Sequence, residues 1–235
     1  MFKWFKPKNS VIQFRCFEED WDVIPKPYPS RKLLPEWFKS LPPKVAKGFE
    51  SSTIKRCAPF LDSMTAGWII PLAADVFIET NDDCSGITWN CKYEKPIIES
   101  HQSWQINGDK HPSSPKPATK FMNYWSIKVP DDWSILFVPP LNRQDPRFTC
   151  MSGLVDCDKY EEFINFPFFW NKSNFEGILP AGTPLVQAIP IHRKSFEMKD
   201  DHHAFTDKEL VDLTKIRARR KTKESLYRDE LWVKK

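Results

Sequence analysis

The sequence predicts a mostly β protein, an antiparallel β-sandwich body that carries a proline-rich N-terminal arm and a C-terminal helix. First, the 235 residues include 21 prolines but only 7 glycines, and proline fixes φ and removes a backbone donor, which disfavours long helices. Second, short β-branched and aromatic runs recur between turn residues, a pattern typical of sandwiches and barrels. Third, one strong helix signal comes last. We therefore place the arm at 1–50, the β body at 51–198, and a linker with the C-terminal helix at 199–235.

Proline crowds the N-terminal arm. Six of the 21 prolines fall between Pro25 and Pro43, and each biases the residue before it toward extended backbone. Pro35–Leu41 could still form one or two helical turns, because proline is well tolerated at the first helical position. Its Trp37 and Phe38 would then dock the arm on the body.

Strand signals fill the β body. Phe60–Leu72 leads into Asp75–Glu79, and Gly86–Tyr93 alternates apolar and polar residues from Ile87 onward, as a half-buried strand does. Asn107–Thr119, rich in proline, serine and lysine, is expected to be a surface loop. Four further strand-sized segments are separated by turn residues: Trp125–Val129, Ser134–Val138, Phe163–Trp170 and Thr183–Ile191.

The C-terminal helix begins with Thr206 and Glu209, which have the spacing of a capping box. Near its end, Arg217–Lys223 carries five cations in seven positions. Such a run could contact a nucleic-acid backbone without reading bases, but a solvated helix end that complements the macrodipole is favoured. Leu226, Tyr227, Leu231 and Trp232 then form an apolar patch that could clasp a neighbouring subunit.

Composition excludes several classes of protein. The formal charge of +4 is too near balance for a dedicated nucleic-acid binder, so any basic partner surface must be local. The apolar stretches are too short for a membrane span, and the basic, aromatic segment Met1–Lys8 lacks the apolar core of a secretory signal. Six cysteines without a CxxC pair indicate reduced thiols.

Three segments in order carry a resemblance to a known family. Ser152–Glu162, with the sequence SGLVDCDKYEE, resembles the central motif of the dUTPase family. Upstream, Ile127–Phe137 is similar to the strands before that family's phosphate loop. Downstream, Ile178–Ile189 is similar to the closing strand of dUTPases and dCTP deaminases. The resemblance covers residues 121–193 and implies a β-clip body that forms a trimer, with nucleotide pockets at subunit boundaries.

The resemblance also implies a catalytic set of Asp156, Asp158 and Tyr160. Asp156 would orient the attacking water and Tyr160 would lie near the sugar. An ionised carboxylate suits the first role because it only accepts hydrogen bonds and can take a proton from water.

The same resemblance implies that Gln187 faces the phosphates. The family's phosphate loop is altered here, because Pro139–Gln144 has no serine and displaces the arginine. Arg143 or Arg147 could supply the missing charge. The family's glycine-rich tail is absent as well, so the resemblance favours nucleotide binding over hydrolysis.

The whole chain further resembles an uncharacterised family of phage and bacterial proteins that shares KRCxPFLDxxTxGxIIPL, from Lys55 to Leu72, and GTPLVQxIP, from Gly182 to Pro190. This resemblance implies a phage setting, and hence a location in the infected host cytoplasm or the virion.

Three functions follow as hypotheses. The leading one is a dUTPase-like nucleotide-binding protein of phage type; its cofactor is left open, with Mg²⁺ as the candidate if a nucleotide is bound. The second is a non-catalytic phage structural, assembly or interaction protein. The third is a metal-dependent oxygenase or cupin-like enzyme around His101, with Glu99, His111 and Asp75 nearby. Such a metal site needs two histidines and a carboxylate, and His101 is otherwise expected at the edge of a ligand pocket.

Overall fold

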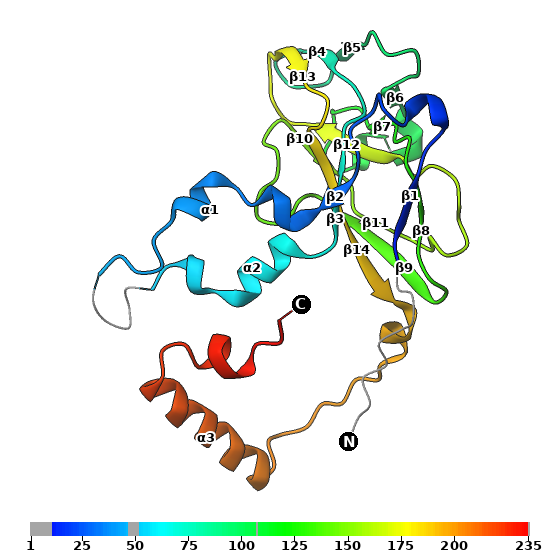
Figure 1. The fold of residues 1–235 in the computed structure, drawn as a ribbon. Coiled ribbons are helices and arrows are strands. Elements are labelled where there is room, and N and C mark those ends of the chain that lie inside the picture. The colour runs from blue at the N-terminus through cyan, green and yellow to red at the C-terminus, as the bar shows by residue number, and fades with distance from the viewer. Residues whose placement is uncertain (1–10, 47–51, 107, 235) are drawn as a thin grey trace.

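A computed structural model describes residues 11–46, 52–106 and 108–234 of the chain (Figure 1). The segment Met1–Lys8 lies outside these residues. The prediction of a mostly β fold with a C-terminal helix is confirmed, and every strand pair within the described residues is antiparallel.

The largest sheet has five strands, with β14 at its centre. β14 pairs with β9 on one side and with β3 on the other, so the C-terminal strand of the body joins segments from both halves of the chain. In spatial order the strands are β11 (Gly153–Val155), β9 (Trp133–Val138), β14 (Pro184–His192), β3 (Trp68–Pro71) and β2 (Tyr28–Pro29).

Three smaller sheets complete the body. The four-stranded sheet contains β10 (Phe148–Cys150), β12 (Phe166–Trp170), β7 (Thr119–Phe121) and β6 (Ile98–Ser100). The three-stranded sheet contains β13 (Glu176–Leu179), β4 (Val76–Thr80) and β5 (Ile87–Asn90). The two-stranded sheet contains β1 (Gln13–Arg15) and β8 (Ser126–Lys128), so the arm adds a strand to the body.

Aromatic side chains from the two larger sheets form much of the core. Phe121 stacks on Phe168 with ring centroids 3.8 Å apart, and Phe137 meets Phe166 at 5.4 Å. All four rings are at most 2% exposed. Because aromatic residues bury large areas in close-packed interiors, these contacts join the sheets into one core.

Short helical segments connect the strands, and most of them are 3-10 helices. The short α1 (Glu36–Ser40) confirms the predicted helical turn, and it buries Phe38 while Trp37 stays half exposed. The 3-10 segments are η1 (Glu18–Asp20), η2 (Ser30–Leu33), η4 (Ile54–Arg56), η5 (Ser103–Ile106), η6 (Gly108–Lys110) and η7 (Arg193–Glu197), and η8 (Tyr227–Leu231) is a π-helix.

The predicted strand signal in Phe60–Leu72 is wrong for its first half, which belongs to α2 (Ala58–Thr65). Pro59 stands in the first turn of this helix, where its missing N–H costs nothing. Met64 is fully buried, so tertiary packing outweighs the local β propensity. Gly67, at φ +65°, then reverses the chain into β3.

The C-terminal helix α3 (Asp207–Thr222) begins with the predicted capping box, since both reciprocal bonds between Thr206 and Glu209 are present. None of its residues is buried, and Figure 1 shows it standing away from the sheets. The chain then returns to α2, where Trp232 Nε1 donates to Asp62 Oδ2 at 2.8 Å and Leu226 is buried. No helix within the described ranges combines the length and apolar character that a membrane span needs.

Candidate functional site

The motif residues Asp156–Tyr160 form a turn at the edge of the five-stranded sheet, directly after β11. The backbone N–H groups of Lys159 and Tyr160 both donate to the Asp156 carbonyl at 2.9 Å. Because this segment is a tight turn and not a strand, strand alternation does not decide which way its side chains face.

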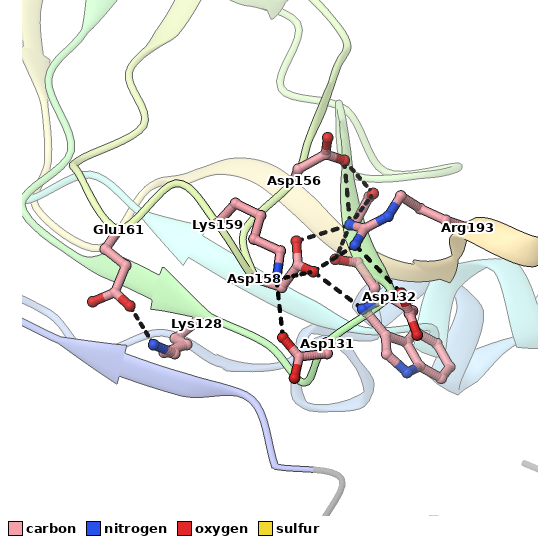
Figure 2. Close-up of polar contacts among 10 residues, drawn as sticks. Lys128, Asp131, Asp132, Asp156, Asp158, Lys159, Glu161 and Arg193 are labelled. Carbon is pink, nitrogen blue, oxygen red and sulfur yellow. Dashed lines mark hydrogen bonds and ion pairs between the residues drawn. The ribbon is translucent and has the colours of Figure 1, made fainter.

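Asp158 is the most constrained residue of the turn. Its side chain is 0% exposed, and both carboxylate oxygens accept from the Arg193 guanidinium, with Nη1 to Oδ1 at 2.8 Å (Figure 2). The Asp132 backbone N–H adds a bond of 3.1 Å. Chiefly because of Arg193, the pKa of Asp158 falls to about 2. The carboxylate therefore stays ionised at neutral pH and is a poor proton acceptor.

Asp156 lies beside this pair but is open to solvent. It accepts from the Ser134 hydroxyl at 2.6 Å and lies 3.5 Å from Arg193 Nη1, while its side chain is 60% exposed. Tyr160 is 49% exposed, and its side chain has no hydrogen bond or ring contact with another described residue. The structure thus brings Asp156 and Asp158 together on Arg193 and leaves Tyr160 outside the cluster.

Neighbouring charges extend the cluster toward the arm (Figure 2). Lys159 pairs with Asp131 at 3.1 Å. Glu161 pairs with Lys128 and, at 3.2 Å, with Arg15, and these bonds lower the pKa of the Glu161 carboxyl. Every charge named here has an opposite charge beside it, which is the pattern of a structural network.

Gln187 is fully buried on β14 and uses both ends of its amide. Its Nε2 donates to the carbonyls of Ser63 and Ala66 at 2.8 and 2.7 Å, and its Oε1 accepts from the Leu141 N–H at 3.1 Å. These three bonds tie the end of α2 and the loop after β9 to the central strand. Gln187 therefore positions that loop and has no donor left for a phosphate.

Arg143 lies on the same loop, and the surroundings of its guanidinium are unusual. All three guanidinium nitrogens are buried, and none has a hydrogen-bond partner among the described residues. Burial lowers the pKa of this guanidinium. Removing a cation from water without a partner is costly, so the buried guanidinium makes Arg143 a candidate ligand-binding residue.

A hollow of about 370 Å³ opens beside Arg143. Lys32 and Lys39 line it from the arm, and Pro184 lines it from the start of β14. Lys39 has only an exposed pair with Glu36 at 3.4 Å, and Lys32 has no ion pair with a described residue. The hollow therefore concentrates positive charge from two segments that lie far apart in the sequence.

Arg147 differs from Arg143 in having a partner. Its guanidinium forms a two-point pair with Asp145, at 3.0 Å to Oδ1 and 2.7 Å to Oδ2. Asp145 also lines the hollow. Of the two arginines that the sequence offers for phosphates, only Arg143 keeps its charge free.

His101 has no polar side-chain partner among the described residues; its backbone N–H donates to the Ala118 carbonyl at 2.8 Å. His111 stacks on Phe169 with ring centroids 4.8 Å apart. Within the described ranges, His, Cys, Asp and Glu side chains do not gather in threes that could hold a metal ion. The metal-enzyme hypothesis around His101 therefore gains no geometric support.

Sequence reasoning missed Lys32 and Lys39 as members of the hollow. They belong to the proline-rich arm, and nothing in their spacing links them to Arg143. Only the pairing of β2 with β3, which places η2 beside the body, brings them there.

Comparisons with known proteins find similarity in structure but not in sequence. No protein-family model matches the sequence, and a search of curated proteins finds no significant relative. Among solved structures, the native EIAV dUTPase is similar at 13% identity and a TM-score of 0.33, over 60% of this chain and 84% of that chain. A mutant dUTPase from phage phi11 of S. aureus, described with a structural Mg(II) ion, is similar at 10% identity and a TM-score of 0.39, over 84% of this chain and 97% of that chain.

Proposed function

We propose that the protein binds nucleotides through their phosphates and does not hydrolyse them. The observation that carries this proposal is the Arg143 guanidinium, which is buried and has no partner among the described residues. A phosphate presents several oxygens to the planar, forked guanidinium and can accept two parallel hydrogen bonds from it.

The hollow beside Arg143 supplies the rest of the site. A rotation of the Arg143 side chain toward the hollow would bring its charge next to Lys32 and Lys39, so that three cations meet one ligand. A volume of about 370 Å³ fits the small end of ligand pockets. The hollow suits the di- or triphosphate group of a nucleotide, with the base of the nucleotide nearer the surface.

Hydrolysis is left out of the proposal because of Asp156 and Asp158. Asp158 is held ionised by Arg193, and Asp156 accepts from Ser134 while lying beside the same guanidinium. A general base should have a pKa near the working pH, and the pKa of about 2 rules out that role for Asp158; the exclusion of Asp156 rests on its contacts with Ser134 and Arg193. Mg²⁺ would accompany the phosphates as a counter-ion, because no metal-binding carboxylate cluster occurs among the residues that the structure describes.

The second candidate is a non-catalytic assembly or interaction protein of phage type. The observation that favours it is the exposed segment before α3, where Phe196, Met198 and Phe205 are each more than 60% exposed. In this alternative the body would act as a homo-oligomeric module, a trimer by the family resemblance, and phosphates would not bind.

Calorimetric titration in phosphate-free buffer tests the proposal, with pyrophosphate, dUTP and ATP, each with and without Mg²⁺. We expect binding that Arg143→Met weakens at least tenfold and Lys32→Met weakens less. Lys172→Met, which removes one exposed charge elsewhere, serves as the matched control and should leave affinity unchanged.

Three outcomes would overturn the proposal. If none of the three phosphates binds, or if Arg143→Met binds as tightly as the unmodified protein, the nucleotide site is not at Arg143. If the protein releases pyrophosphate from dUTP and Asp156→Asn abolishes that release, the exclusion of hydrolysis is wrong.

A further inference from the structure

The basic run near the end of α3 is divided by the structure into two sets. Arg219 and Lys223 both pair with Glu230 of η8, the latter at 2.7 Å, so their charges are neutralised within the C-terminal segment. The side chains of Arg217, Arg220 and Lys221 have no hydrogen bond or ion pair with a described residue. They stand at i, i+3 and i+4, and residues so spaced share one face of a helix.

A second hollow, of about 580 Å³, lies between this face and residues 52–59. Arg56, Arg220 and Arg228 line it, together with one acidic residue, Glu224. Glu224 is already paired, at 2.6 Å with Lys44 and at 3.3 Å with Arg56. The free charge of this lining is therefore positive and comes from Arg220 and Arg228.

The same hollow contains an exposed aromatic ring. Tyr227 lines it and is 48% exposed, and its ring packs on no aromatic ring of the described residues. A positive groove with an unstacked aromatic side chain is the combination that binds single-stranded nucleic acids, since phosphates follow the cations and bases stack on the ring.

We propose that this hollow and the adjoining face of α3 bind single-stranded nucleic acid. Arg217, Arg220, Lys221 and Arg228 contact successive phosphates, and Tyr227 stacks one base. The surface is separate from the Arg143 hollow, because the two share no lining residue. It agrees with a chain that is nearly neutral as a whole, in which a basic partner surface must be local.

The arrangement fits a membrane surface poorly. A helix that lies on a bilayer needs an apolar face opposite its cationic face. On α3, Leu210 and Leu213 continue the same stripe that carries Arg217 and Lys221, whereas Val211 lies on another side. The helix therefore cannot insert its apolar residues while its cations reach lipid headgroups from the other side.

Fluorescence anisotropy with labelled 12-nucleotide dT and mixed-sequence strands, at 50 to 300 mM NaCl, tests the proposal. We expect the affinity to fall with salt, and the combined Arg217→Glu, Arg220→Glu and Lys221→Glu change to weaken binding at least tenfold. For single strands each lost phosphate contact lowers the salt slope by about 0.7, so the triple change should lower it by about 2. Tyr227→Ala should weaken the affinity for the strands about fivefold or more, and Tyr227→Phe, which keeps the ring, should bind as the unmodified protein does.

Matched controls separate this surface from general charge and from the nucleotide site. Changing Lys199, Lys208 and Lys215 to Glu removes the same charge from the linker and from the other side of α3, and should leave affinity nearly unchanged. Arg143→Met should also leave it unchanged, so the two proposals can fail independently. Thermal unfolding of each variant shows whether it remains folded.

Four outcomes would overturn the inference. The first is no binding of either strand at 50 mM NaCl. The second is equal weakening by the control triple change. The third is tighter binding of a duplex that Tyr227→Ala does not affect. The fourth is binding to anionic lipid vesicles in the absence of any binding to the oligonucleotides.

Discussion

Asp158 and Arg193, 35 residues apart, form a two-point ion pair that joins the turn after β11 to the residue following β14 (Figure 2). Arg193 Nη1 also donates to the Trp133 carbonyl at 3.1 Å, so the start of β9 is included. One guanidinium thus ties together the ends of three neighbouring strands, β11, β9 and β14. The motif that suggested chemistry from the sequence therefore has a structural explanation in this pair.

Replacing Asp158 with Asn should lower the free energy of unfolding by about 2 kcal/mol, because the charge-assisted hydrogen bonds from Arg193 to a buried carboxylate are lost. Urea denaturation at pH 7 measures the loss. Asp131→Asn is the control, since Asp131 is 85% exposed and pairs with an exposed lysine. Its effect should stay within about 1 kcal/mol, and a similar loss from both variants would contradict the structural role of Asp158.

The same pair predicts how stability depends on pH. An unfolded aspartate has a pKa of about 3.9, whereas Asp158 in the folded protein has a pKa of about 2. Because the folded value is the lower one, the stabilisation is complete above about pH 4 and is lost as the pH falls toward 2. The difference in unfolding free energy between the unmodified protein and Asp158→Asn should therefore shrink between pH 5 and 2.5; a constant difference would exclude this assignment.

Local patterns predicted much of the fold and less of the site. The strands at 133–138 and 184–192, the turn of α1 and the capping box at Thr206 follow from periodicity and turn chemistry, which act over a few residues. The helix α2 was missed because burial of Met64 decides it. The ligand-binding candidate Arg143 came from a family resemblance, while Lys32 joins it only through strand pairing between distant segments.

Arg143→Met should raise the free energy of unfolding in phosphate-free buffer, by about 1 to 3 kcal/mol. The change replaces a buried, unpaired cation with an apolar side chain of similar length, which removes a desolvation penalty. Urea denaturation with and without 5 mM pyrophosphate measures the free energy of unfolding of both proteins in the free and the ligand-bound state. Pyrophosphate should stabilise the unmodified protein and not the variant. Destabilisation of Arg143→Met without any ligand would mean that the guanidinium has a partner in the free protein.

Gln187→Leu should destabilise the protein by about 3 kcal/mol. The substitution leaves the Leu141 N–H and the carbonyls of Ser63 and Ala66 without their partner, and unsatisfied buried groups cost about 1 to 3 kcal/mol each before relaxation. Because Gln187 holds the loop that bears Arg143, pyrophosphate affinity should fall as well. Gln187→Glu keeps the acceptor for the Leu141 N–H but places a carboxylate against the Ser63 and Ala66 carbonyls, so it should destabilise the protein at least as much; a variant that loses affinity but no stability would contradict the positioning role.

Adding a single methyl group at Gly67 should strongly lower the stability of the protein. Its φ of +65° is a conformation that L-residues adopt at a cost, and an added Cβ would lie 2.0 Å from the Ala188 carbonyl oxygen on β14. That oxygen belongs to the central strand and cannot move without breaking the sheet, so Gly67→Ala should cost more than about 3 kcal/mol. Gly153→Ala is the control, because its Cβ would meet nothing within 4 Å. Thermal unfolding should place Gly153→Ala near the unmodified protein and Gly67→Ala far below it, and equal midpoints would show that β3 and β14 do not approach so closely at this turn.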